Sequence, residues 1–251
     1  PQNFAALVYA HGGGAMMGTP DYENGLCSRL ACENDIVIFN VDYRLAPEHR
    51  TPAGGLDMIA ALKYAHEKAH QYGIDTYKIS LGGSSGGAFT SMIASILLVR
   101  QKENGNEANL VNTLILICPM LGTSLDDLPE NSVAEWEKPY INCLKYELIA
   151  SDYAKQHSER DPLLYPVEVS LEEAKLLPRT VLFTSEFDWM RRDTFSLVTK
   201  LKKAGTYVDH GDYAGSAHCF MAWVPDPNTD LFHRDMKKVF DNYVPSPKKK
   251  D

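Results

Sequence analysis

The chain has 251 residues, of which 44% are hydrophobic and 23% are charged, and its formal net charge is −8. A chain of this size can bury one substantial core, so we expect a single catalytic domain over residues 1–251. The acidic balance argues against binding to nucleic acid, and the lack of a long apolar run argues against stable membrane insertion.

Five cysteines are scattered along the chain: Cys27, Cys32, Cys118, Cys143 and Cys219. Their number is odd and none has CxxC spacing, so the sequence predicts neither a disulfide framework nor a zinc site. We expect reduced, mostly buried thiols in a cytoplasmic protein. The chain starts at Pro1 without a methionine or a signal peptide, which leaves open a leader or N-terminal segment before it.

Apolar runs typical of buried strands alternate with helical patterns along the chain. The expected strands cover residues 4–10, 36–42, 77–81, 112–118, 180–185 and 207–213. The expected helices cover residues 52–73, 88–99 and 194–204. Gly73 is the expected stop of the first helix and Gly205 that of the last. This alternation predicts an α/β fold with a mostly parallel sheet covered by helices on both faces.

Residues 121–178 interrupt the alternation. The segment holds five prolines, and a helix is expected over residues 142–157. At the carboxyl edge of a parallel sheet such an excursion can form a lid or a wall of the substrate pocket. A packed excursion without substrate contact is an equal alternative.

A glycine-flanked serine follows the strand expected at 77–81. Residues 82–87 read Gly-Gly-Ser-Ser-Gly-Gly and lead into a helix, a layout typical of a nucleophile elbow. Small neighbours let such a serine reach a carbonyl, so we take Ser84 as the candidate nucleophile. In isolation the motif fits a connecting or phosphate-binding turn equally well.

A second glycine loop, residues 11–14, follows the first expected strand. Two glycine loops at strand ends can converge on one carbonyl oxygen, and the start of the helix after residue 87 adds unpaired N–H groups. We expect His11 to brace this loop. His66 and His70 lie one helical turn apart, but without a third ligand they favour a solvated helix face over a metal site.

A nucleophilic serine needs a histidine base and a carboxylate that orients it. Asp188 follows the strand expected at 180–185, and His218 follows the last strand-like run. The chain order Ser84, Asp188, His218 is that of α/β-hydrolases. Glu186 is the second candidate for the acid because it follows the same strand.

Several motifs together resemble the hormone-sensitive-lipase-like family of α/β-hydrolase esterases. They are His-Gly-Gly-Gly at 11–14, Asp-Tyr-Arg-Leu-Ala-Pro-Glu-His at 42–49, Gly-Gly-Ser-Ser-Gly-Gly at 82–87, Asp-Pro-Leu at 161–163, Asp188, and His-Cys-Phe at 218–220. The resemblance covers nearly the whole chain. It implies the α/β-hydrolase fold and a cofactor-free serine carboxylesterase that hydrolyses small to medium acyl esters through an acyl-enzyme.

The resemblance also implies roles for single residues. Ser84 would be the nucleophile, Asp188 the orienting acid and His218 the general acid and base. The oxyanion hole would be formed by the N–H groups of Gly13, Gly14 and Ser85. Asp42, Arg44 and His49 would belong to a structural loop network near the site.

Three departures from the family pattern stand out. The family usually has an acidic residue between the first glycine and the serine of this motif, where this chain has Gly83. The acid loop, which usually reads Asp-Pro-Leu-Arg-Asp, has a different sequence after Asp188. The cap helices and two strands that precede the His-Gly-Gly-Gly strand in the family are not found. We therefore expect an open pocket, and an exposed sheet edge at residues 36–42 that could pair in a homodimer.

Two other functions remain open. A non-catalytic small-molecule receptor of the same fold would keep the pocket without turnover. A serine hydrolase that cleaves amides, such as a deacetylase, would use the same groups on a poorer leaving group.

Overall fold

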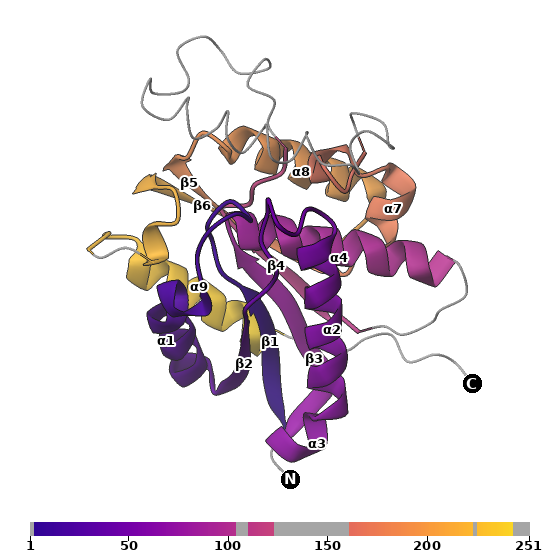
Figure 1. The fold of residues 1–251 in the computed structure, drawn as a ribbon. Helices are drawn as coiled ribbons and strands as arrows, with labels where there is room; N and C mark the ends of the chain where they lie inside the picture. Colours follow the sequence, from indigo (N-terminus) through magenta and orange to yellow (C-terminus); the bar gives the residue numbers. More distant parts are fainter. Residues whose placement is uncertain (1–2, 104–109, 123–160, 223–224, 243–251) are drawn as a thin grey trace.

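The computed structural model describes residues 3–103, 110–122, 161–222 and 225–242. Six strands form one sheet in the order β2-β1-β3-β4-β5-β6, and every neighbouring pair is parallel (Figure 1). The strands are β1 Phe4–Ala10, β2 Ile36–Val41, β3 Ile74–Ser84, β4 Thr113–Ile117, β5 Arg179–Phe187 and β6 Val208–Ala217. The predicted α/β class and parallel sheet are confirmed.

Helices occupy both faces of the sheet. They are α1 Asn24–Asn34, α2 Ala53–Glu67, α3 Ala69–Tyr72, α4 Gly86–Glu103, α7 Leu171–Leu176, α8 Arg191–Ala204 and α9 Thr229–Asp241, with short 3-10 helices η1 Pro20–Glu23, η3 Pro166–Glu168 and η4 Phe220–Ala222. The predicted helix at 52–73 is divided at Lys68 into α2 and α3. Gly73 and Gly205 end their helices in the left-handed conformation, as expected.

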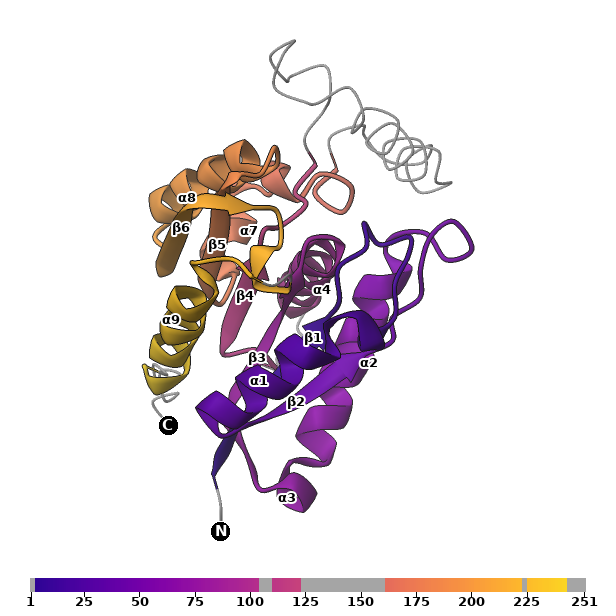
Figure 2. The same cartoon turned by 90° about the vertical axis from the view of Figure 1, so that its left-hand side faces the viewer.

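The side chains of β1 show how the sheet separates two cores. Ala6 and Val8 pack with residues of α2, α4 and α8, whereas Leu7 and Tyr9 pack with residues of α1 and α9. Alternate residues of a strand point to opposite faces, so an unbroken apolar strand requires helices on both sides. Figure 2 looks onto the face covered by α1 and α9.

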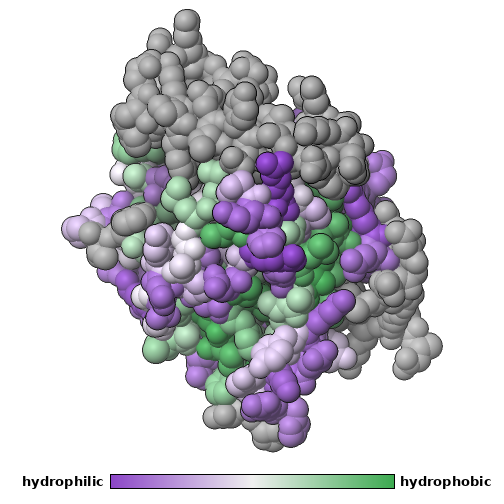
Figure 3. Space-filling view, in the orientation of Figure 1, coloured by the Kyte–Doolittle hydropathy of each residue, from purple (hydrophilic) through white to green (hydrophobic). Residues whose placement is uncertain are grey.

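Strand β2 forms one edge of the described sheet, as expected. Most of its residues are only partly buried although five of the six are apolar. Figure 3 shows hydrophobic residues at the surface over this edge. Pairing of the edge with a second copy of the chain stays a prediction.

Most of the excursion at 121–178, including the helix expected at 142–157, lies outside the described residues. Residues 161–178, which the structure describes, contain η3 and α7, and a capping box between Ser170 and Glu173 begins α7. The lid hypothesis therefore stays a prediction. None of the helices in the described ranges combines the length and apolar character that a bilayer crossing requires.

The parallel topology gathers the candidate site residues at one edge of the sheet. The chain leaves β3 at Ser84, β5 at Phe187 and β6 at Ala217. The carboxyl ends of parallel strands lie together, so the loops after these three strands meet there.

Candidate active site

A sharp turn at Ser85 joins β3 to α4. Ser85 has a φ of 51°, which is rare for a residue with a side chain and typical of the serine in a nucleophile elbow. The glycines two residues before and after it are tightly packed. A Cβ on Gly83 would lie 2.7 Å from the carbonyl carbon of Gly87, and one on Gly87 would lie 2.0 Å from the Ala10 oxygen. The elbow is therefore centred on Ser85.

The two adjacent serines point to different partners. The Oγ of Ser85 lies 2.9 Å from Nε2 of His218, whereas the Oγ of Ser84 donates to Glu23 at 2.6 Å. Ser84 is fully buried at the end of β3. The structure thus contradicts the expected pairing of Ser84 with His218. The motif Gly-x-Ser-x-Gly fits residues 82–86 and 83–87 equally well, and the tertiary contacts select the second register.

In this register Ser84, rather than Gly83, occupies the position between the first glycine and the elbow serine. The residue that stands where the family usually has an acidic residue is therefore Ser84. A carboxylate is nevertheless present beside it, because Glu23 of η1 reaches the same place from another part of the chain.

Asp188 and His218 lie together, as the sequence analysis expected. Nδ1 of His218 is 2.8 Å from Oδ2 of Asp188, and the other carboxylate oxygen accepts the Met190 N–H at 2.9 Å. The Asp188 side chain is buried, so its charge is poorly screened at His218. Glu186, the second candidate, accepts the N–H of Gly215 instead.

The environment of His218 stabilises its protonated form. Burial opposes the charged imidazolium, but the hydrogen bond and negative charge of Asp188 outweigh burial, with further contributions from Cys118 and Glu23, and raise the pKa of His218 to about 8. A carboxylate can only accept a hydrogen bond, so Nδ1 carries a proton. The neutral ring then presents the lone pair of Nε2 to Ser85.

The backbone near Ser85 bears on the expectation that its N–H is an oxyanion donor. The N–H of Ser85 donates to the Ile117 carbonyl at 2.8 Å, so it is already occupied. The next N–H, that of Gly86, belongs to the first residue of α4 and has no acceptor within the helix. A Cβ on Gly86 would lie 2.6 Å from the Gly14 nitrogen. Gly86 therefore replaces Ser85 beside the glycine loop.

The loop carrying Gly13 and Gly14 is ordered by its own contacts. The Gly13 oxygen accepts the N–H groups of Met16 and Met17, and the φ of Gly13 is 125°. A Cβ on Gly13 would lie 2.0 Å from the Met17 oxygen, so only glycine fits there.

His11 packs beneath the surface and supports the same loop, as expected. It is fully buried and stacks on Tyr43, with ring centroids 4.6 Å apart. Its Nδ1 lies 2.7 Å from the Gly12 oxygen, while the Tyr43 hydroxyl donates to the His11 oxygen.

The loop at 42–49 is fixed to α2 by a two-pronged ion pair. The Arg44 guanidinium donates to both oxygens of Asp57, and the His49 N–H donates to the Leu45 oxygen. These contacts accord with a structural role for Arg44. A role for Asp42 in the network stays a prediction.

Glu23 is a buried carboxylate that the sequence analysis did not single out. It accepts hydrogen bonds from the Tyr9 hydroxyl at 2.6 Å, the Ser84 hydroxyl and the Gly12 N–H. Burial, and then the charge of Glu23, raise the pKa of the neighbouring Cys27 thiol to about 12. This carboxylate joins η1, the end of β1, the end of β3 and the glycine loop.

A cavity of about 510 Å³ opens beside these groups. Its lining is mostly apolar and includes Gly13, Gly14, Met17, Tyr22, Glu23, Ser85, Met120, Trp189, Met190, His218 and Cys219. Ser85 lines the cavity and Ser84 does not. Trp189 and Met190 come from the loop whose sequence departs from the family pattern, so that loop forms part of the pocket wall.

His66 and His70, the pair weighed as a possible metal site, lie in α2 and α3. Nε2 of His66 lies 2.9 Å from the Leu110 carbonyl oxygen, which explains this side chain without an ion. Among the described residues, neither His66 nor His70 lies in a group of three donors that could hold a metal.

Comparisons with known proteins extend over most of the chain. The sequence profile of the family described as alpha/beta hydrolase fold matches residues 7–222. Esterase LipI of Mycobacterium tuberculosis is 29% identical, over 81% of this chain and 61% of that protein. Arylacetamide deacetylase of Bos taurus is 27% identical, over 87% of this chain and 68% of that protein.

A solved structure shares the arrangement of the elements. EstE1, a thermophilic and thermostable carboxylesterase cloned from a metagenomic library, has a TM-score of 0.82 and 26% identity. The similarity covers 97% of this chain and 82% of that one. The predicted α/β-hydrolase fold is confirmed. The chain spans about three fifths of the length of LipI.

Glu23→Gln should destabilise the protein although the shape of the side chain is kept. Glutamine has one acceptor oxygen where the carboxylate has two, so the three donors around Glu23 cannot all be satisfied as before. We expect the free energy of unfolding to fall by about 1 to 3 kcal/mol, measured by urea denaturation at pH 7. The matched control is Glu67→Gln on the exposed surface of α2; equal losses in the two variants would contradict the role of Glu23.

Proposed function

Because the chain belongs to the hormone-sensitive-lipase-like family of α/β-hydrolase esterases, we propose that it is a serine carboxylesterase whose nucleophile is Ser85. The observation that carries this proposal is the chain of contacts from Ser85 Oγ to His218 Nε2 at 2.9 Å and from His218 Nδ1 to Asp188 at 2.8 Å. It links a nucleophile, a base and an orienting carboxylate in the order that acyl transfer requires.

Acylation begins when neutral His218 takes the proton of Ser85 as its Oγ attacks the ester carbonyl. Asp188 stabilises the imidazolium that forms and keeps Nε2 directed at the serine. The carbonyl oxygen becomes an oxyanion as the tetrahedral intermediate forms. His218 then gives its proton to the leaving alcohol, and the acyl group stays on Ser85.

The developing oxyanion would be stabilised by the N–H groups of Gly13, Gly14 and Gly86. The positive end of α4 adds to this stabilisation because the helix begins at Gly86. One such donor typically contributes about 3 to 4 kcal/mol to the transition state. The steric fit of Gly86 against Gly14 supports this set of donors.

Water completes the cycle by the same route. His218 deprotonates a water molecule that attacks the acyl carbonyl, and the Ser85 oxygen leaves with the proton returned by His218. No metal or organic cofactor takes part in these steps.

The cavity supports an apolar acyl group of small to medium size. Its volume of about 510 Å³ lies within the range of small-molecule sites, and Met17, Met120 and Trp189 supply apolar wall. Amide substrates are the second candidate, which the similarity to arylacetamide deacetylase favours. The same residues would act on an acetamide, with the leaving amine protonated by His218.

Ser85→Ala and Ser84→Ala should separate the two adjacent serines. Removal of the Ser85 hydroxyl deletes the nucleophile, so kcat for p-nitrophenyl acetate should fall by about five orders of magnitude or more. Removal of the Ser84 hydroxyl deletes one hydrogen bond to Glu23, so kcat/KM should fall by less than about tenfold, or 1.4 kcal/mol.

A fluorophosphonate probe with peptide mass spectrometry supplies the control, because it marks a reactive serine without needing the right substrate. We expect the adduct on Ser85 in the parent and in Ser84→Ala, and no adduct in Ser85→Ala. An adduct on Ser84, or full activity in Ser85→Ala, would reject the assignment. An acyl series from acetate to palmitate and a matched acetanilide then measure chain length and the preference for ester over amide.

The pH profile should report the raised pKa of His218. Only the neutral ring accepts a proton from Ser85, so kcat/KM should be low below pH 6.5, rise through an apparent pKa of about 8 and level off above it. Asp188→Asn should move the midpoint to lower pH, because the interaction that raises the pKa is lost. A parent profile that is flat between pH 6 and 9 would contradict the proposed base.

A further inference from the structure

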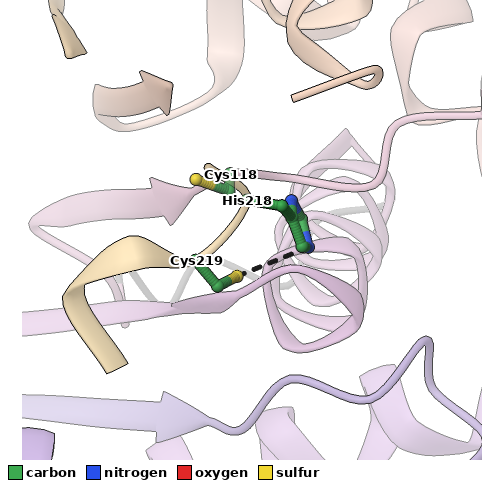
Figure 4. Close-up of side chains that lie close together, drawn as sticks. All are labelled: Cys118, His218 and Cys219. Atoms are coloured by element: carbon green, nitrogen blue, oxygen red, sulfur yellow. Dashed lines mark hydrogen bonds between the residues drawn. The ribbon is translucent and has the colours of Figure 1, made fainter. Parts of the chain in front are cut away.

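Two cysteines far apart in the sequence converge on His218. Cys118 follows β4, and Cys219 follows β6 directly after His218 (Figure 4). Their sulfurs and one ring nitrogen of His218 lie within 4.8 Å of one another. Within the described ranges this is the one group of three potential metal donors. The proposed ester hydrolysis uses neither sulfur.

We propose that Cys118, His218 and Cys219 form an inhibitory site for a thiophilic divalent cation such as Zn²⁺ or Cd²⁺. The ion would bind Nε2 of His218 and both sulfurs as thiolates. The inhibitory consequence rests on the proposed function, whereas binding of the ion does not.

The donor set suits such an ion. Two thiolates and one imidazole, with water in the fourth position, form a known tetrahedral zinc set. Around a tetrahedral zinc ion these donors lie about 3.5 to 3.8 Å apart, as follows from the usual bond lengths. The Sγ of Cys219 is already 3.4 Å from Nε2 of His218, as the dashed line in Figure 4 marks. The Sγ of Cys118 lies within 4.8 Å of the Sγ of Cys219 and of a ring nitrogen of His218, so side-chain rotation would bring in this third donor.

The surroundings of His218 favour Nε2 as the ligand. Its other nitrogen, Nδ1, donates to Asp188, and a carboxylate behind a ligating imidazole is the usual second partner in zinc sites. His218 and Cys219 both line the cavity, which gives an ion and its water a path to the site. Cys118 lies behind them and is 1% exposed.

The backbone holds both cysteines in place. Cys118 and Cys219 have φ values of 44° and 54°, in the left-handed region that residues with side chains seldom adopt. The N–H of Cys118 donates to the Phe183 carbonyl, and the Cys219 carbonyl accepts the N–H of Ala222. The two sulfurs are therefore presented from fixed turns that follow β4 and β6, the strands on either side of β5, which limits the rearrangement that binding requires.

Charge balance also favours a divalent ion. Each thiol loses its proton on binding, so two thiolates neutralise one Zn²⁺ or Cd²⁺, and the protons are released to solvent. The ion and its three donor groups together carry no net charge, which reduces the cost of burying the centre. With its lone pair bound to the ion, Nε2 can no longer accept the proton of Ser85.

The test uses reduced, metal-free protein without a histidine tag. Cd²⁺ is titrated while the ultraviolet thiolate-to-metal charge-transfer band is recorded, which needs no substrate. In parallel, Zn²⁺ is added during hydrolysis of p-nitrophenyl acetate, and a chelator is then added in excess. The variants are Cys118→Ala and Cys219→Ala, and the matched control is Cys32→Ala, which removes an exposed cysteine of α1.

We expect a saturating band at one equivalent of Cd²⁺ in the parent and in Cys32→Ala, and reversible loss of activity with Zn²⁺. Loss of one thiolate should weaken the band and raise the Zn²⁺ concentration for half inhibition by at least about tenfold. Each variant is compared with its own metal-free rate. If Cys118→Ala does not fold, Cys118→Ser supplies the same comparison.

Other results would overturn the proposal or separate it from the proposed function. No band in the parent, or a band kept in Cys118→Ala and Cys219→Ala, would reject the site. Full binding of Cd²⁺ and Zn²⁺ by an active enzyme that stays active would reject inhibition through His218. A cysteine-dependent band in a protein that hydrolyses no ester or amide would support the ion site and reject the proposed function.

Discussion

The contact between the start of α4 and the end of β1 leaves no room for a side chain. Gly83 and Gly87 both face the Ala10 carbonyl oxygen, at 2.4 and 2.0 Å from where their Cβ atoms would lie. This steric constraint brings the turn after β3 against the glycine loop after β1. Ser85, Gly86 and Gly14 come together because the three elements approach so closely. The positive φ of Ser85 is the local cost of that approach.

Glu23 connects this packing to the electrostatics of the site. A buried carboxylate is tolerated because three donors surround it, and those donors come from β1, β3 and the glycine loop. Its charge also contributes, after Asp188 and Cys118, to the raised pKa of His218. One side chain thus fixes the loops and favours the protonated base. A carboxylate near the nucleophile is common to the family pattern and to this chain, but here it belongs to η1 instead of the elbow.

The sequence was sufficient for features that depend on local chemistry. The strands and the helices α2, α4 and α8 followed from apolar periodicity, whereas α1, α7 and α9 were not predicted. Gly73 and Gly205 were recognised as helix ends because a left-handed residue favours glycine. Asp188 and His218 were found because both follow strands that end at the same edge. The expected position of residues 36–42 at an edge of the sheet agrees with the place of β2 in the described sheet.

Features set by contacts between distant segments were not accessible in this way. Residues 82–87 contain two overlapping matches to one motif, and their composition is symmetrical about the pair Ser84 and Ser85. Only the hydrogen bonds to Glu23 and His218 distinguish the two serines. The proposed change of oxyanion donor from Ser85 to Gly86 follows from the same shift by one residue. Neither Glu23 nor the meeting of Cys118 with Cys219 has a signature in local spacing.

The sulfurs beside His218 serve the fold and its chemistry in separable ways. Cys118 and Cys219 both belong to the core on the face covered by α1 and α9, where a thiol packs as a small apolar group. Other small apolar residues could fill the same space in the core. Packing therefore does not explain why the Sγ of Cys219 lies 3.4 Å from Nε2 of His218. The lone pair of Nε2 can accept a proton from Ser85 or bind a metal ion, but not both. A histidine oriented by a carboxylate is prepared equally for either partner, so its neighbours determine which use is available.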